Sequence, residues 1–155
     1  MKSFAMVVAI VALTLLPAAA APRVPFAERQ AHAAESSFPA DSILGEWWTE
    51  NKDGRIRFVK HEDGTYRGVV TWGARPRKDQ YNKDPKRRDR PIVGMVLIWH
   101  LVYRDEEFQD GSIYNPEDGG TYRVKAWLTS RNSLNLRGYM GISLLGKTQS
   151  WTRYL

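Results

Sequence analysis

The chain has 155 residues, a formal net charge of +6 and no cysteine. Its length and its 43% content of hydrophobic residues fit one globular domain, which disfavours both a multidomain enzyme and a disordered tail protein. The lack of cysteine excludes disulfides, thiolate catalysis and cysteine-ligated zinc, whereas the positive charge permits acidic partners without requiring them.

The N-terminal residues have the pattern of a secretory signal. Lys2 precedes an apolar run, Phe4–Leu16, and small residues follow this run. The run is shorter than the roughly 20 apolar residues that cross a bilayer. We therefore predict that residues 1–20 are a cleaved signal peptide, that the protein is periplasmic or secreted, and that the mature chain holds no transmembrane segment.

Two cleavage positions fit the sequence, one near Ala20 and one near Ala33. Residues 21–41 contain several prolines and show no convincing period, which is typical of a linker. We predict that this segment is a flexible lead-in and that the folded domain spans residues 42–155.

The rest of the chain consists of short β-rich runs that are separated by turns. Asp53-Gly54 and Asp63-Gly64 are strong hairpin signals because glycine accepts a positive φ. The predicted strands are residues 44–49, 55–61, 65–72, 92–103, 107–114, 120–129, 133–140 and 148–154.

Apolar and polar side chains alternate in these runs, as Ile56 and Phe58 do with Arg55 and Arg57. An open sheet of this size would leave its apolar face in water, and the short sequential connections favour an up-and-down barrel over a Greek-key sandwich. The sequence therefore predicts an all-β fold, an eight-stranded up-and-down β-barrel with a long basic loop between the third and fourth strands. The run 92–103 is apolar on both parities, which predicts a strand covered on both faces.

The lumen of such a barrel is either filled by side chains or holds one small ligand, and the sequence leaves both possibilities open. A ligand in an apolar lumen would be a small apolar or amphiphilic molecule. The residues predicted to line the lumen are Phe58, Tyr66, Val70, Val96, Ile98, Val124, Leu128 and Leu136.

Basic side chains are concentrated between residues 75 and 90. Asp79, Asn82 and Asp84 indicate Asx-type turns that would order this loop. The loop either contacts an anionic envelope surface or is a solvated structure whose charges pair locally. The candidate anion contacts are Arg75, Arg77, Lys78, Lys86, Arg87, Arg88 and Arg90.

No residue pattern indicates catalysis. The histidines, among them His61 and His100, are not spaced as zinc ligands, and the oxygen donors of residues 79–84 lack the glycine and glutamate of an EF-hand. We expect His100 in the core or lumen and Glu46 at the rim or on the exterior. The export pattern argues against nucleic acid as a partner. We therefore expect no catalytic residue, metal, cofactor or nucleic acid, and leave the oligomeric state open.

Ordered motifs extend from the first predicted strand to the last. They include Gly45-x-Trp47, Arg88-Asp89-Arg90-Pro91-x-x-Gly94, Leu136-Arg137-Gly138-Tyr139-x-Gly141 and Lys147-Thr148-Gln149-x-Trp151-Thr152-Arg153. Through these motifs the chain resembles DUF2147, an exported bacterial family of unknown function. The resemblance implies a small lipocalin-like barrel, and it implies no established activity from which a catalytic residue could be carried over.

Gly45-x-Trp47 also resembles the first-strand motif of lipocalins, in which the tryptophan closes one barrel end and a late arginine packs over it. An indole near the start of the first strand can plug the barrel, and Arg153 lies beside it if the last strand pairs with the first. A guanidinium over an indole contributes about 0.5 to 2 kcal/mol. We therefore predict that Gly45, Trp47 and Arg153 close the barrel.

Two functions are compatible with the sequence. The first is an exported lipocalin-like barrel that binds a small apolar or amphiphilic ligand in its lumen. The alternative is a non-enzymatic envelope interaction module that uses the basic loop surface and has a barrel filled by side chains.

Overall fold

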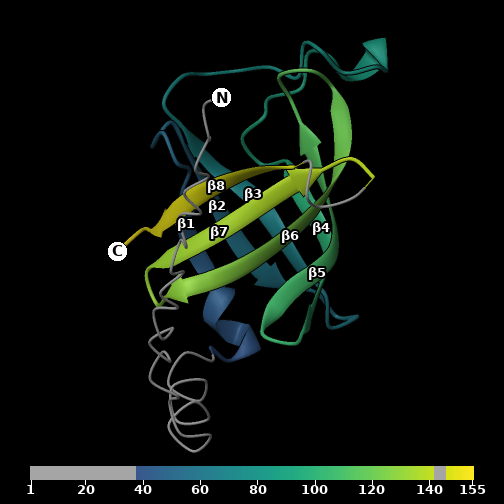
Figure 1. Ribbon diagram of the computed structural model, residues 1–155. Coiled ribbons are helices and arrows are strands. Elements are labelled where there is room, and N and C mark those ends of the chain that lie inside the picture. Colours follow the sequence, from purple (N-terminus) through teal and green to yellow (C-terminus); the bar gives the residue numbers. More distant parts are fainter. Residues whose placement is uncertain (1–37, 142–145) are drawn as a thin grey trace, which may run out of the picture.

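The computed structural model describes residues 38–141 and 146–155 (Figure 1). The predicted signal peptide, residues 1–20, and most of the predicted lead-in, residues 21–37, lie outside the described residues. Within the described ranges, no helix is long and apolar enough to cross a membrane.

Eight antiparallel strands in the described part of the chain close into a barrel, in which each strand pairs with its neighbours in sequence and the last pairs with the first. This confirms the predicted fold class, with a fourth strand that begins at Val96 rather than at residue 92. The strands are β1 (Gly45–Trp48), β2 (Gly54–Lys60), β3 (Tyr66–Gly73), β4 (Val96–Arg104), β5 (Glu107–Asn115), β6 (Gly120–Ser130), β7 (Ser133–Tyr139) and β8 (Lys147–Arg153), with the 3-10 helices η1 (Ala40–Ile43) and η2 (Pro85–Arg87) in connections.

The barrel closes where β1 meets β8, with Trp47 opposite Arg153. The Arg153 guanidinium carbon lies 4.2 Å from the centre of the Trp47 ring. The same guanidinium donates hydrogen bonds to the carbonyl oxygens of Ser42 at 2.6 Å and Leu44 at 2.9 Å. Gly45 has a φ of +103°, and a Cβ there would lie 3.3 Å from Arg153 Nη1. The Gly-x-Trp motif and the late arginine thus form one contact.

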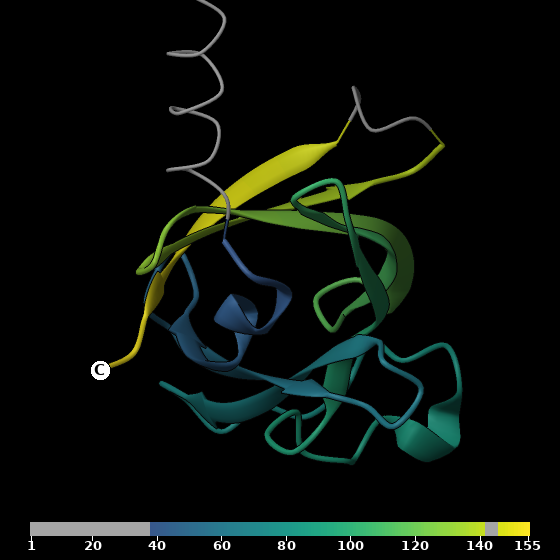
Figure 2. The same ribbon diagram turned by 90° about the horizontal axis from the view of Figure 1, so that it is seen from below.

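Helix η1 lies across one end of the barrel, inside the ring of strands in Figure 2. Ile43 is fully buried there, and its carbonyl oxygen accepts a hydrogen bond from the Trp47 indole at 2.8 Å. Asp41 accepts hydrogen bonds from the Tyr66 hydroxyl at 2.6 Å and from Lys60 Nζ at 3.0 Å. Residues 38–41, part of the predicted lead-in, are therefore packed on the barrel and help to close it.

The half of the barrel next to η1 is filled by side chains. Aromatic rings pack against one another there, with Tyr66 and Phe108 perpendicular at 5.2 Å between ring centres. Side chains of this size exclude water and supply most of the apolar burial. The buried side chains of this packed half are Ile43, Trp47, Phe58, Tyr66, Leu101, Phe108, Ala126 and Leu134.

The prediction that the fourth strand is covered on both faces is wrong. His100 on β4 and Asp110 on β5 have φ angles of 60° and 59°, so each strand holds one residue in the left-handed region. Such a residue resets the alternation of side chains along a strand. Ile98 and Leu101 are therefore both fully buried, whereas His100 between them is exposed. Val96 is exposed as well, beyond a register shift between β3 and β4. The expected position of His100 in the core or lumen is also wrong.

Candidate functional site

The other half of the barrel contains a cavity of about 530 Å³. It lies at the end where the β1–β2, β3–β4 and β5–β6 connections meet, opposite η1. Pockets of a few hundred Å³ with apolar walls and a few polar groups are typical of small-molecule sites. The apolar side chains that line the cavity include Ile56, Val70, Leu97, Ile98, Ile113, Val124, Leu136 and Trp151.

Four of the residues predicted for the lumen line this cavity. They are Val70, Ile98, Val124 and Leu136.

The other four predicted lumen residues lie elsewhere. Phe58 and Tyr66 belong to the packed half, and Leu128 is a partly buried residue that packs against the core. Val96 is 43% exposed and does not line the cavity, because the β3–β4 register shifts between the pairs Gly68–Ile98 and Val69–Val96, so that Val96 does not share the face of Ile98. Its assignment to the lumen wall is therefore corrected.

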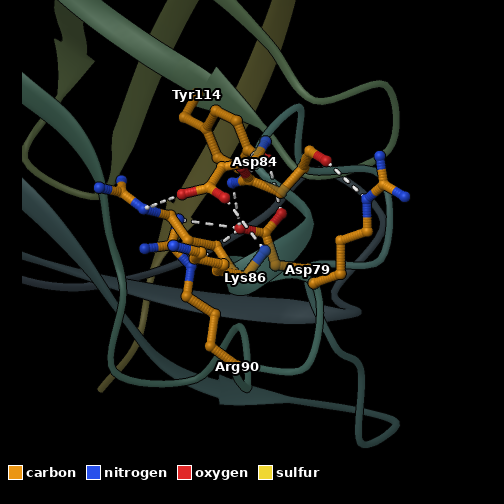
Figure 3. A network of polar contacts seen from close by, with 8 residues as sticks. Asp79, Asp84, Lys86, Arg90 and Tyr114 are labelled. Atoms are coloured by element: carbon orange, nitrogen blue, oxygen red, sulfur yellow. Dashed lines mark hydrogen bonds and ion pairs between the residues drawn. The ribbon is translucent and has the colours of Figure 1, made fainter.

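The basic loop is built around one buried carboxylate, Asp79, which is fully buried (Figure 3). The Tyr114 hydroxyl donates to Asp79 Oδ1 at 2.6 Å. Asn82 Nδ2 and Arg90 Nε donate to Asp79 Oδ2 at 2.7 and 2.9 Å. Because Tyr114 also lines the cavity, this network joins the loop to the cavity wall through β5.

The charge of Asp79 is stabilised by these partners. Burial acts to raise the pKa of the Asp79 carboxyl, but the hydrogen bonds from Tyr114, Asn82 and Arg90 and the charge of Arg90 outweigh it, so that the pKa lies below its usual value. The carboxylate is therefore ionised at neutral pH and holds both chain segments together.

The predicted Asx-type turns are present in the loop. The backbone N–H of Asp84 donates to Asn82 Oδ1 at 2.9 Å, and that of Lys86 donates to Asp84 Oδ1 at 3.0 Å. Gly119 in the β5–β6 turn has a φ of +67°, and a Cβ there would collide with the carbonyl oxygen of Tyr81. The loop is thus an ordered structure that packs closely against this turn.

The seven basic candidates divide into three groups. Arg75 and Arg77 line the mouth of the cavity, where Arg77 pairs with Glu117 at 3.4 Å. Lys86 is exposed. The remaining four cations contact partners within the loop. Lys78 pairs with Asp89 at 2.9 Å, Arg87 pairs with Asp84 at 3.3 Å, and Arg90 pairs with Asp79 at 2.8 Å. Arg88 donates a hydrogen bond to the carbonyl oxygen of Asn82 at 2.9 Å.

Sequence reasoning missed the polar side chains of the cavity, above all Gln149. Gln149 lies opposite Leu136 on the neighbouring strand, two residues from Trp151, so it shares the inward parity of β8. The shared parity of Gln149 and Trp151 was the available signal, but a neutral amide has neither the charge nor the metal-binding chemistry by which a site is recognised in a sequence.

The remaining chemical candidates lie outside the cavity. Glu46 is on the outer face of β1, where it pairs with Arg57 at 2.6 Å and Arg55 at 3.3 Å. In residues 38–141 and 146–155, no group of three or more histidine or acidic side chains is placed to hold a metal ion.

Comparison with known proteins agrees with this architecture. The family model described as "uncharacterized protein conserved in bacteria (DUF2147)" matches residues 45–153. The chain belongs to the DUF2147 family. Among solved structures, a similar one is described as "Protein HP1028 from the human pathogen Helicobacter pylori belongs to the lipocalin family". It is 25% identical to this chain, with a TM-score of 0.66 over 73% of this chain and 83% of that one. No curated protein matches the sequence.

Proposed function

We propose that this member of the DUF2147 family binds a small apolar or amphiphilic molecule in the open half of its barrel. The observation that carries the proposal is the cavity of about 530 Å³, which has a wall of aliphatic side chains and reaches the loops at the mouth. A ligand that buries on the order of 300 Å² of apolar surface gains roughly 7 kcal/mol before the cost of association is subtracted. Micromolar affinity is therefore within reach.

The proposed activity is binding rather than catalysis. The strands contribute aliphatic side chains such as Val70, Val124 and Leu136 to the cavity wall, and the ionised Asp79 is engaged by three donors. We also propose export, on the signal-like pattern of residues 1–20, with a ligand that is met outside the cytoplasm. Mass spectrometry of the mature N-terminus tests the export, and a chain that keeps Met1 contradicts it.

The alternative of an envelope interaction module has weaker support. Four of the seven basic candidates contact partners within the loop, and the barrel has a cavity where that function would have a filled core. Because these basic side chains contact groups of their own loop, their main role is to keep the loop at the mouth of the cavity ordered.

The test is saturable binding together with extraction of native ligand. Protein purified without detergent is extracted with solvent for mass spectrometry, and a fluorescent apolar dye is titrated into the extracted protein. Leu136→Trp places a large ring in the cavity, whereas Asn135→Trp places the same ring on the outer face of β7. We expect the first variant to lose dye binding and the second to keep it. An empty extract together with equal dye binding by both variants contradicts the proposal.

A further inference from the structure

Strand β8 presents a graded row of side chains to the cavity. Lys147, Gln149 and Trp151 all line it, and they are separated by two residues each, as expected for one face of a strand. Trp151 is 4% exposed and lies deepest, whereas Lys147 is exposed beside the mouth. The row therefore passes from an aromatic ring through an amide to a cation.

The orientation of the Gln149 amide follows from its neighbour. The Trp151 indole Nε1 lies 3.1 Å from Gln149 Oε1, and an indole N–H can only donate a hydrogen bond. The amide oxygen must therefore face the indole, which leaves the NH₂ group as the free end. In the part of the chain that the structure describes, this NH₂ group has no hydrogen-bond partner. A donor in an apolar wall needs an acceptor from water or from a ligand.

The charges at the mouth are of two kinds. Each of its carboxylates accepts a hydrogen bond from the protein: Glu50 from the Ser150 backbone N–H at 3.0 Å, Asp53 from the Thr49 hydroxyl at 2.7 Å and Glu117 from Arg77 at 3.4 Å.

The cations Lys147 and Arg75 differ from these carboxylates. Neither forms an ion pair or a side-chain hydrogen bond within residues 38–141 and 146–155. Both are thus available to a ligand at the mouth.

We propose that the cavity selects a single-chain amphiphile whose head group carries anionic oxygen, a carboxylate or a phosphate. The Gln149 NH₂ group and the Lys147 ammonium bind the head group, while the tail packs against Trp151 and the aliphatic wall. This inference rests on the proposed function, and it adds the chemical class of the ligand. A neutral alcohol of the same chain length accepts a hydrogen bond from Gln149 but gains nothing from the charge of Lys147.

The test compares head groups on one tail. Decanoate, decyl phosphate, decanol and decyltrimethylammonium, each below its micelle concentration, are titrated against the full chain in a dye-displacement assay at neutral pH and low salt. We expect at least one of the two anions to bind about tenfold tighter than decanol, as charge-assisted hydrogen bonds imply. Tighter binding of decanoate identifies a carboxylate ligand, and tighter binding of decyl phosphate identifies a phosphate ligand.

Gln149→Glu is the decisive variant because its carboxylate still accepts the hydrogen bond from Trp151 but presents negative charge instead of a donor. We expect it to weaken binding of the anions about tenfold and binding of decanol less than about threefold. Asn135→Asp makes the same charge change on the outer face of β7, where its side chain still accepts from the Ser150 hydroxyl. This control should change neither affinity. Lys147→Gln, at an exposed position, should weaken anion binding about threefold and reduce its dependence on salt.

The outcomes separate the two proposals. If none of the four probes binds the wild-type protein, ligand binding in the cavity is wrong. If decanol binds as tightly as both anions, or if Gln149→Glu behaves like Asn135→Asp in a folded protein, the cavity remains a binding site and the anionic head group is wrong.

Discussion

The two halves of the barrel are built from the same eight strands, yet one is packed and the other is hollow. Near η1 the large side chains Trp47, Phe58 and Phe108 meet in the interior and η1 covers the end, whereas the wall of the open half includes small aliphatic side chains such as Val70 and Val124. The interior of an eight-stranded barrel is just wide enough for side chains to fill. The aromatic side chains that meet near η1, together with η1 itself, therefore account for the packed half, and the alternation alone does not distinguish the two halves.

The two ends are also fixed by different polar contacts. At the packed end, Arg153 donates to backbone carbonyls of the segment that leads into β1. At the open end, Asp79 accepts from side chains of the long loop and of β5. Each end thus depends on one charged group with several partners, but only the open end leaves space beside it.

The largest difference between the halves should appear in a matched pair of leucines on β7. Leu134 is fully buried in the packed half, and Leu136, two residues along, lines the cavity. Leu134→Ala should lower the free energy of unfolding by about 3 kcal/mol because it leaves a void. Leu136→Ala should cost about half as much, because it enlarges a space that already exists. Chemical denaturation measures both values, and equal losses would mean that the two halves are equally packed.

Replacement of Arg153 tests the packed end. Arg153→Lys keeps the charge but cannot reproduce the planar contact with Trp47 together with the hydrogen bonds to Ser42 and Leu44. We expect a loss of about 2 kcal/mol in the free energy of unfolding. Ligand affinity at the far end should not change. A variant as stable as the wild type would show that η1 and the aromatic core alone close this end.

Replacement of Asp79 tests the open end. Asp79→Asn should lower the free energy of unfolding by about 1 to 2 kcal/mol, since Arg90 loses its charged partner. The folded-state pKa of Asp79 is lowered, so its contribution is fully present above the ordinary carboxyl pKa of about 3.9 and is lost as the pH falls through the folded-state value.

Thermal unfolding of Asp79→Asn and of the wild type between pH 7 and pH 3 measures this effect. The stability difference should shrink as the pH falls below about 4. Hydrogen exchange should locate the loosened amides in residues 78–91. A difference that stays constant down to pH 3 would show that the charge of Asp79 is not responsible.

The smallest effect is expected for the exposed ion pairs of the same loop. Lys78 and Asp89 lie 2.9 Å apart with both side chains largely in water. Lys78→Ala should cost less than about 0.5 kcal/mol. A larger loss in denaturation would mean that surface pairs, and not Asp79, hold the loop.

The sequence was sufficient to predict the closed barrel, but it did not show which part of the interior is packed and which part is hollow. Eight alternating runs and the pair of Trp47 with Arg153 predicted closure, because alternation and turn residues are local properties. The change of phase in β4 was not predictable in the same way, since His100 and Asp110 adopt left-handed angles that their residue types do not require. For this reason His100 was misplaced, and a separate register shift between β3 and β4 at Gly68 and Val69 moved Val96 off the inward face.

The position of the cavity required the fold as well. Phe58 and Val70 have the same inward parity on adjacent strands, and only the placement of η1 shows that one lies in the packed half and the other in the cavity wall. Gln149 became a candidate only when its partner Trp151 and the cavity were known together.

Both ends of the described chain lie at the packed end of the barrel. Phe38 accepts a hydrogen bond from Tyr103 near the β4–β5 turn, and the backbone N–H of Tyr154 donates to Glu46 beside η1. A fusion partner, an affinity tag or an immobilising linker joined after Leu155 would therefore start from the end of the barrel opposite the mouth. Sensors and pull-down reagents can be built on this protein without obstructing ligand entry.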